Sequence, residues 1–318
     1  MSELSRLPRR IAQGLLMGGA DIIPGVSGGT MALIAGIYRD LIDAISEGTT
    51  AVLLLLRGRF SDAWAAFRDM NWGLLLPVVG GILTAIAIGS LFIPELLERY
   101  PVQCRALFFG LVAASLVIPW RERNEHHAWH YAVALVFGLV AFFLVGLPRS
   151  GDAADPSLWR VAGTAAIAIN AMILPGVSGA FLLEVFGLYS PTLEALRSLD
   201  VPYVMAFCGG AAIGIALAAK GLSYLLEHHH DLTMTALVGL LAGSLRALWP
   251  WVERIQHVSS DGEVEWVPDP SVLLAPGADW PVALALAVGG FAAVTALAWV
   301  GRRQLETADD VLVEKMHR

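Results

Sequence analysis

Long apolar runs set the tightest limit on how this 318-residue chain can fold. They include residues 72–97, 103–119, 129–147, 202–227, 232–249 and 280–300. A helix needs about 20 predominantly apolar residues to cross a bilayer. Only 15% of the residues are charged, compared with about a quarter in a typical soluble domain. The sequence therefore predicts an all-α polytopic membrane protein.

Two of the most apolar stretches are interrupted by the same string of helix-breaking residues. The stretch ADIIPGVSGGTMALIAGIY begins at Ala20, and AMILPGVSGAFLLEVFGLY begins at Ala171, so the two align without gaps at an offset of 151 residues. Further along, Gly80-Gly81 matches Gly209-Gly210 at an offset of 129 residues. The chain is therefore predicted to be a duplication, with extra residues of the first copy lying within Gly48–Asn71.

The Pro-Gly break in each copy allows two membrane topologies. The segment is either a spanning helix broken in the middle or a re-entrant hairpin that enters and leaves on one side. Cytoplasmic loops carry an excess of Lys and Arg. Re-entrant hairpins place most of the loop Lys and Arg residues on the side of the N-terminus, whereas broken spanning helices divide them more evenly. Hairpins are therefore favoured, with both termini in the cytoplasm.

With one hairpin and about three crossings in each copy, the second copy is upside down relative to the first. Such inverted repeats are a frequent plan of secondary transporters. The first repeat is predicted over residues 1–150, with a hairpin at 11–47 and transmembrane helices at 72–97, 103–119 and 129–147. The second repeat is predicted over residues 151–318, with a hairpin at 159–198 and transmembrane helices at 202–227, 232–249 and 280–300. The acidic loop Val252–Asp279 is predicted to lie outside.

In this arrangement the two breaks meet near the middle of the membrane, and a helix begins at each. A helix N-terminus offers unpaired N–H groups and a partial positive charge, which bind phosphate or carboxylate. Hydroxyl groups beside each break add donors, and glycines let a ligand approach the backbone. The alternative is that Pro and Gly only kink packed helices. The candidate substrate-binding residues at the breaks are Ser27, Gly28, Gly29, Thr30, Ser178, Gly179 and Ala180. Ala180-Phe181 stands where the first copy has Gly29-Thr30, so the second site is expected to be the weaker one.

Charged residues in apolar segments are costly and are therefore candidates for function. Arg39, Arg105 and Arg246 are candidate phosphate ligands, because an arginine forks bidentately and stays charged. The alternative for these arginines is that they extend to the membrane interface. Glu184 and Asp21 are candidate carriers of a coupling proton, because burial raises a carboxyl pKa. Either carboxylate could instead serve as a helix cap or in an ion pair.

Enzymatic chemistry is not expected. The string Gly-Val-Ser-Gly-Gly fits a hydrolase pattern, but that pattern needs a strand-to-helix turn, and an intramembrane serine nucleophile needs a base on a neighbouring helix. The histidines lie in loops or at helix ends and lack acidic or cysteine ligands at a fixed spacing, so neither a metal nor a cofactor is expected. No basic, aromatic-interleaved patch indicates nucleic acid.

The two breaks also carry a family resemblance. GGADIIPGVSGGTMALIAGIYRDLIDAIS resembles the first signature of the bacterial polyprenyl-phosphate transporter family, and LPGVSGAFLLEVFGLY resembles its second. The resemblance covers the chain from about Arg10 to Val300. It implies a multi-pass protein of the bacterial plasma membrane that returns undecaprenyl phosphate from the outer to the inner leaflet, recycling the lipid carrier of peptidoglycan. The polyprenyl-phosphate lipid as a partner comes from this resemblance alone. From the residues, a secondary transporter of a small anion remains an alternative, and the oligomeric state is open, a homo-oligomer included.

Overall fold

The computed structural model describes residues 3–23, 26–125, 127–148, 153, 155–176, 178–258 and 264–316. Most of these residues are helical, and two antiparallel strands form a small sheet. In chain order the elements are α1 (Glu3–Asp21), α2 (Gly28–Ile34), α3 (Tyr38–Leu56), α4 (Phe60–Asp69), α5 (Trp72–Gly89), α6 (Ile93–Arg99), α7 (Pro101–Ser115), α8 (Val117–Arg121), α9 (Ala128–Val145), α10 (Leu158–Ile173), α11 (Gly179–Val185), α12 (Tyr189–Ser198), α13 (Val201–His228), α14 (His230–Ser244), the 3-10 helix η1 (Leu245–Leu248), β1 (Val252–Val258), β2 (Val264–Leu273) and α15 (Trp280–Met316).

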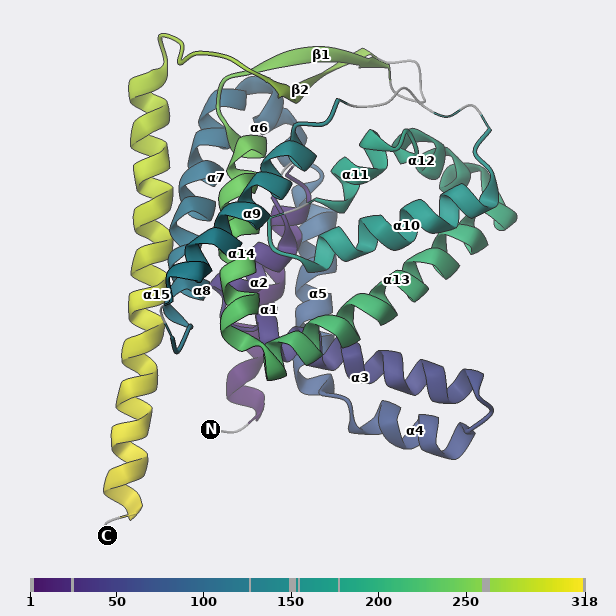
Figure 1. Cartoon of the computed structure of the whole chain (residues 1–318), viewed down its shortest axis with the longest axis vertical. Coiled ribbons are helices and arrows are strands. Elements are labelled where there is room, and N and C mark those ends of the chain that lie inside the picture. The colour runs from purple at the N-terminus through teal and green to yellow at the C-terminus, as the bar shows by residue number, and fades with distance from the viewer. Residues whose placement is uncertain are drawn as a thin grey trace.

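The helices form a bundle whose two ends differ. Helices α5, α7, α9, α14 and α15 run along the long axis of the molecule, and the start of α1 and the end of α15 lie toward the same end (Figure 1). The β1–β2 sheet lies across the opposite end (Figure 1). The sequence predicted only an acidic loop there. The sheet is an addition to the predicted helical fold.

Among the described residues, five helices are long and apolar enough to span a membrane. They cover Trp72–Gly89, Pro101–Arg121, Ala128–Val145, Val201–His228 and His230–Leu248. Two shorter apolar helical stretches are Leu158–Ile173 and Trp280–Ala296. The protein is therefore a multi-pass membrane protein, as the apolar runs predicted. The predicted crossing at 72–97 is divided, because α5 ends at Gly89 and α6 begins at Ile93.

Both Pro-Gly strings interrupt a helix. The first Pro-Gly pair lies outside the described residues, which resume at Val26, and Ser27 is the N-cap of α2. At the second break α10 ends at Ile173, Gly176 has a positive φ of 94°, and Ser178 is the N-cap of α11. Glycine adopts this backbone conformation without steric cost, and serine is a preferred N-cap. The local sequence thus explains both where one helix stops and where the next starts.

Corresponding helices of the two copies pack in corresponding pairs. Helix α1 packs against α5, and α10 packs against α13. At both contacts glycines allow close approach, since a Cβ at Gly81 or Gly210 would collide with the backbone of the facing helix. Small residues serve this purpose widely in membrane helix pairs. Between the copies, α7 packs against α15 and α9 against α14.

The main hydrophobic core is shared by both copies. It contains Leu33 and Val78 from the first copy and Leu237 and Leu241 from the second, all of them buried. Because residues of both copies fill one core, the two breaks are held in a fixed relation to each other. This core therefore positions the candidate site.

Candidate functional site

The two helix breaks contact each other directly. The Ser27 hydroxyl donates to the carbonyl of Met172 (3.3 Å), and the Tyr38 hydroxyl donates to the carbonyl of Ile173 (3.2 Å). The N–H of Gly176 donates to the Thr30 hydroxyl (3.0 Å). Three side chains of the first copy therefore bind the backbone of the second break.

The helix end at the first break is occupied by the protein itself. The Asp21 carboxylate accepts from the N–H of Gly28 at 2.7 Å, and the Ser27 hydroxyl accepts from the N–H of Gly29 at 3.2 Å. A Cβ at Gly28 would collide with the Asp21 carboxylate, and one at Gly29 would crowd the carbonyl of Ile173. The glycines expected to admit a ligand here admit other parts of the chain instead.

The second break is built from the same string but is more open. The Ser178 hydroxyl accepts from the N–H of Phe181 at a long 3.4 Å. Met172 stands at the position equivalent to Asp21, so no carboxylate caps this helix from the equivalent position. Gly179 is buried, and its missing side chain lets α11 approach the carbonyl of Ala168 on α10. Ala180, by contrast, is exposed.

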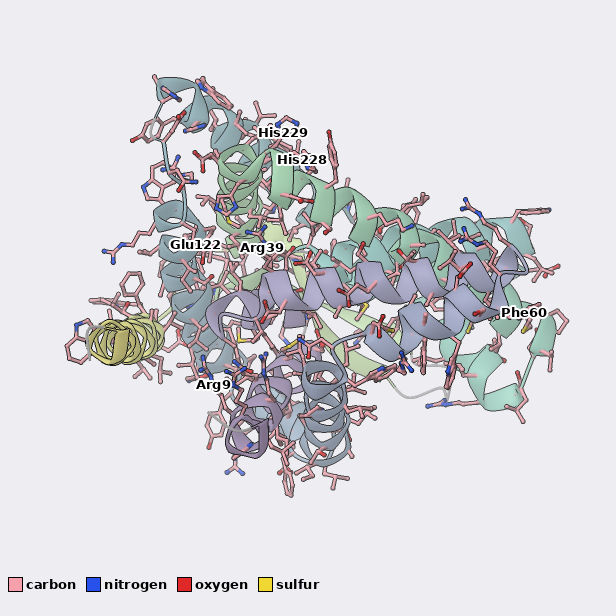
Figure 2. The ribbon with its side chains drawn as sticks, turned by 90° about the horizontal axis from the view of Figure 1, so that it is seen from below. Arg9, Arg39, Phe60, Glu122, His228 and His229 are labelled. Atoms are coloured by element: carbon pink, nitrogen blue, oxygen red, sulfur yellow. The ribbon has the colours of Figure 1, made fainter. Side chains whose placement is uncertain are left out.

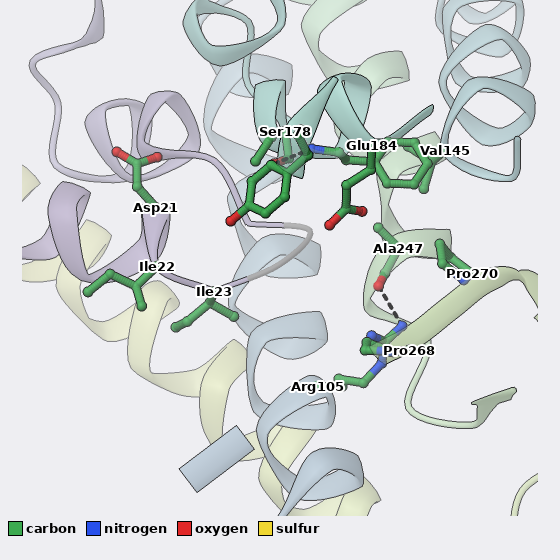
Figure 3. Close-up of a pocket in the computed structure, with 14 residues that line it drawn as sticks. Asp21, Ile22, Ile23, Arg105, Val145, Ser178, Glu184, Ala247, Pro268 and Pro270 are labelled. Atoms are coloured by element: carbon green, nitrogen blue, oxygen red, sulfur yellow. Dashed lines mark hydrogen bonds between the residues drawn. The ribbon is translucent and has the colours of Figure 1, made fainter. Parts of the chain in front are cut away.

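A cavity of about 110 Å³ lies beside the second break. Figure 3 shows its wall, with the carboxylate groups of Asp21 and Glu184 on different sides and Arg105 bonded to the carbonyl of Ala247. Its lining combines residues of both copies and of β2: Asp21, Ile22, Ile23, Arg105, Val145, Gly176, Ser178, Ala180, Phe181, Glu184, Tyr189, Ala247, Pro268 and Pro270. Five residues that the sequence singled out therefore lie around one space: Asp21, Arg105, Ser178, Ala180 and Glu184.

The two arginines near the sheet bind backbone carbonyls. Arg105 is 7% exposed and donates to the carbonyls of Trp249 (2.9 Å) and Ala247 (2.6 Å). Arg246 does not line the cavity; its guanidinium donates to the carbonyls of Pro270 and Ser271 on β2, both at 2.9 Å. The arginines thus fasten the sheet and the loop before it over the cavity, and of the two only Arg105 reaches its wall.

Arg39 lies away from this cavity. It is exposed at the start of α3, and Figure 2 shows it near Glu122 at the end where α1 begins. Burial raises the pKa of the Glu122 carboxyl, and the nearby charges of His230 and Arg39 partly oppose that rise. The structure therefore does not bring Arg39 together with the other candidate ligands.

Sequence reasoning missed several contributors to the site. Tyr189 lines the cavity, and its counterpart Tyr38 binds the second break; these tyrosines are the last residues of the two aligned stretches that begin at Ala171 and Ala20. Their matched Gly-x-Tyr positions were the signal that could have identified them. Pro268 and Pro270 belong to a sheet that no sequence pattern indicated. Among the described residues, no group of three His, Cys, Asp or Glu side chains is arranged to hold a metal.

The fold and this site define a class: a polytopic helical membrane protein in which two helix breaks contact each other beside a cavity with charged and apolar residues in its wall. Within that class the sequence is specific. A sequence model of the family described as undecaprenyl phosphate translocase-like matches residues 17–265. The chain belongs to this family, as the two signatures predicted.

Two curated relatives illustrate the similarity. A polyprenyl-phosphate transporter of Vibrio cholerae serotype O1 is 35% identical over 257 residues, which cover 79% of this chain and 80% of the relative. A polyprenyl-phosphate transporter of Staphylococcus aureus is 29% identical over 261 residues, which cover 76% of this chain and 85% of the relative. No solved structure matches the chain.

Proposed function

We propose that this protein carries undecaprenyl phosphate across the bacterial inner membrane, from the outer to the inner leaflet, and catalyses no covalent step. Family membership supports the substrate, and the similar relatives carry the name of transporters. The observation that carries the proposal is the cavity between the two breaks, which joins Ser178, Arg105 and two carboxylates in a largely apolar protein. Charged and polar groups inside a membrane are energetically costly, and they mark substrate pathways.

The proposed topology is an inverted repeat with two re-entrant hairpins, residues 1–150 forming one repeat and residues 151–318 the other, with both termini in the cytoplasm. Three observations support it. The pairing of α1 with α5 matches that of α10 with α13. The breaks contact each other. The start of α1 and the end of α15 lie toward the same end of the molecule (Figure 1).

The size of the cavity indicates which part of the lipid it receives. At about 110 Å³ it is far smaller than the roughly 300–1,000 Å³ sites of drug-sized ligands. It can hold the phosphate group but no long prenyl chain, so the chain stays among the lipid tails while the phosphate passes through the protein. The Ser178 hydroxyl and the N-terminus of α11 are the proposed donors, with Arg105 supplying positive charge at the wall.

The charges around the cavity support coupling to a proton. Among the described residues, two carboxylates, Asp21 and Glu184, line it together with one arginine, Arg105. A phosphate entering beside two carboxylates would meet strong repulsion, which is poorly shielded away from water. Protonation of one carboxylate reduces that repulsion, and protonation of Asp21 also weakens its hydrogen bond with the N–H of Gly28. Transport is therefore proposed to move a proton with each phosphate group.

A small inorganic or organic anion is the second candidate substrate, because the cavity volume suits a free phosphate as well as a lipid headgroup. The two functions differ in what must be transported. Lipid movement is measured with purified protein in liposomes that carry a fluorescent polyprenyl phosphate in one leaflet. A membrane-impermeant quencher reports how much of the lipid has reached the other leaflet. Uptake of radioactive inorganic phosphate into the same liposomes measures the alternative.

We expect lipid movement that is faster when the loaded side is acidic, and no uptake of inorganic phosphate. Glu184→Gln should reduce the response to the pH gradient, whereas Glu194→Gln on α12, which does not line this cavity, is the matched control and should not. Uptake of inorganic phosphate without lipid movement would establish the alternative. Lipid movement that ignores the gradient in the unmodified protein would exclude proton coupling.

A further inference from the structure

The first copy carries a segment that the second lacks. Residues 48–71, called the arm here, comprise the second half of α3, the whole of α4 and the loop between them. In the second copy the equivalent helix α12 ends at Ser198, and α13 begins soon after, at Val201. The arm projects sideways from the end of the bundle where α1 begins, and it runs across the direction of the spanning helices (Figure 1).

One face of α4 exposes large aromatic rings. Phe60, Trp64 and Phe67 follow the helical spacing i, i+4, i+7 and are 69%, 66% and 43% exposed. Ala63, by contrast, is buried in the helix pair. Contiguous exposed apolar groups of this kind mark contact with a membrane or a protein. The arm thus presents a helix with one aromatic face that Trp72 covers in part, beside Phe67, and that is otherwise exposed.

The arm is joined rigidly to the start of a spanning helix. Trp72 is the first residue of α5, its ring lies 4.6 Å from that of Phe67, and its indole N–H donates to the carbonyl of Phe67 at 2.7 Å. Beyond Trp72, α5 exposes Leu76 and Leu83, as a lipid-facing helix does. Tryptophan is enriched where spanning helices meet the headgroups. The aromatic face of α4 is therefore continuous with the lipid-facing surface of α5, at headgroup depth.

The charges of the arm suit lipid phosphates. Arg57 is exposed at the end of α3; its backbone N–H donates to the carbonyl of Leu53, and its guanidinium makes no hydrogen bond or ion pair with the described residues. Arg59 pairs with Asp62 at 2.6 Å, and Arg68 lies 3.9 Å from Asp69. Helices that lie flat on membranes combine an aromatic face with arginines that reach the headgroups. A lipid surface therefore fits both the apolar and the cationic groups.

We propose that the arm is an interfacial anchor, with Phe60, Trp64 and Phe67 inserted among the headgroups of the leaflet at the end of the bundle where α1 begins. Figure 2 shows Phe60 at the far tip of the arm. Helix α3 runs unbroken from the arm back to Tyr38, whose hydroxyl holds the second break. Anchoring the arm therefore also fixes the depth of the site in the membrane.

Depth-dependent quenching of a fluorescent label tests this proposal in the full-length protein. In a background with Cys104→Ala and Cys208→Ala, single cysteines replace Phe60 or Trp64, and a third variant, Asp69→Cys, places the label on the opposite face of α4. Each variant is labelled and placed in nanodiscs of phosphatidylethanolamine and phosphatidylglycerol. Quenching by a nitroxide-bearing lipid is compared with quenching by aqueous iodide.

Labels at positions 60 and 64 are expected to be quenched several-fold more by the lipid nitroxide, relative to iodide, than the label at 69. Equal quenching by iodide at all three positions would overturn the proposal, because the arm would then lie in water. Protection of positions 60 and 64 from both quenchers would also overturn it, since another protein surface, such as a second copy, would then cover the face.

Discussion

The two Pro-Gly-Val-Ser-Gly breaks have the same five residues, but their side chains make different hydrogen bonds. At the first, Ser27 and Thr30 are 3% and 1% exposed, and both bind the backbone of the other break. At the second, Ser178 faces the cavity and makes one long hydrogen bond. The hydroxyl groups of the first break thus bind the second break, whereas Ser178 faces the cavity in which we propose that the phosphate binds.

The substituted positions explain this division. Asp21 caps the first helix end, and its equivalent in the second copy is Met172. Glu184 lines the cavity from the second copy, and its equivalent in the first is the buried Leu33. Each copy therefore contributes one carboxylate to the same cavity, but from a different place in its motif. The sequence had suggested a weaker second site, whereas the geometry supports the second break as the ligand-binding one.

Removing the hydroxyl of Thr30 should have the largest effect on the contact between the breaks. Thr30→Val keeps the shape but leaves the buried N–H of Gly176 without its acceptor, which costs about 1–3 kcal/mol. Thermal unfolding in detergent measures the loss. Thr84→Val removes a hydroxyl that bonds only within α5 and is the matched control, with little expected change. Equal stability of the two variants would mean that the breaks are not held together by this bond.

Truncating the cap of the first break should have a smaller effect on stability. Asp21→Ala leaves the N–H of Gly28 without its carboxylate, and the loss of a helix cap costs about 0.5–2 kcal/mol. Met172→Ala changes the equivalent position of the second copy, where the side chain packs beside Gly179 but accepts no hydrogen bond, so no N–H group loses its acceptor. The same pair of variants also sharpens the proposed mechanism, because only Asp21→Ala should weaken the response of lipid transport to a pH gradient. A response equal to that of Met172→Ala would remove Asp21 from the proton pathway.

Replacing either serine should have the smallest effect on stability, and the two variants should differ in whether they weaken lipid binding. Ser27→Ala loses a buried hydroxyl with two partners, so its unfolding free energy should fall by about 0.5–1.5 kcal/mol. Ser178→Ala should unfold almost like the unmodified protein but bind polyprenyl phosphate more weakly. Binding is measured by the concentration of lipid needed to raise the unfolding temperature. If Ser27→Ala weakened lipid binding more than Ser178→Ala does, Ser27 and not Ser178 would be the serine that contacts the phosphate.

Parts of the fold could be read from local sequence, and parts could not. The apolar runs predicted the spanning helices, because length and hydropathy are local properties. The Pro-Gly pairs predicted that a helix begins after each break, and α2 and α11 begin there. The division between α5 and α6, the strands at Val252–Val258 and Val264–Leu273, and the sideways course of the arm were not predicted. Each of these depends on what the segment packs against rather than on its own composition.

The candidate site, like the fold, was predicted from the sequence only in part. The sequence by itself determined that the helices break at two equivalent points, that hydroxyl groups follow the breaks, and that rare charges stand near them. Only the tertiary structure decided which of these groups are left for a ligand. A hydroxyl or a helix end binds whichever partner is closest, and the partners of Ser27 and Thr30 lie more than a hundred residues away in the chain. Packing of the two copies against each other therefore turned two similar motifs into a structural contact and a cavity wall.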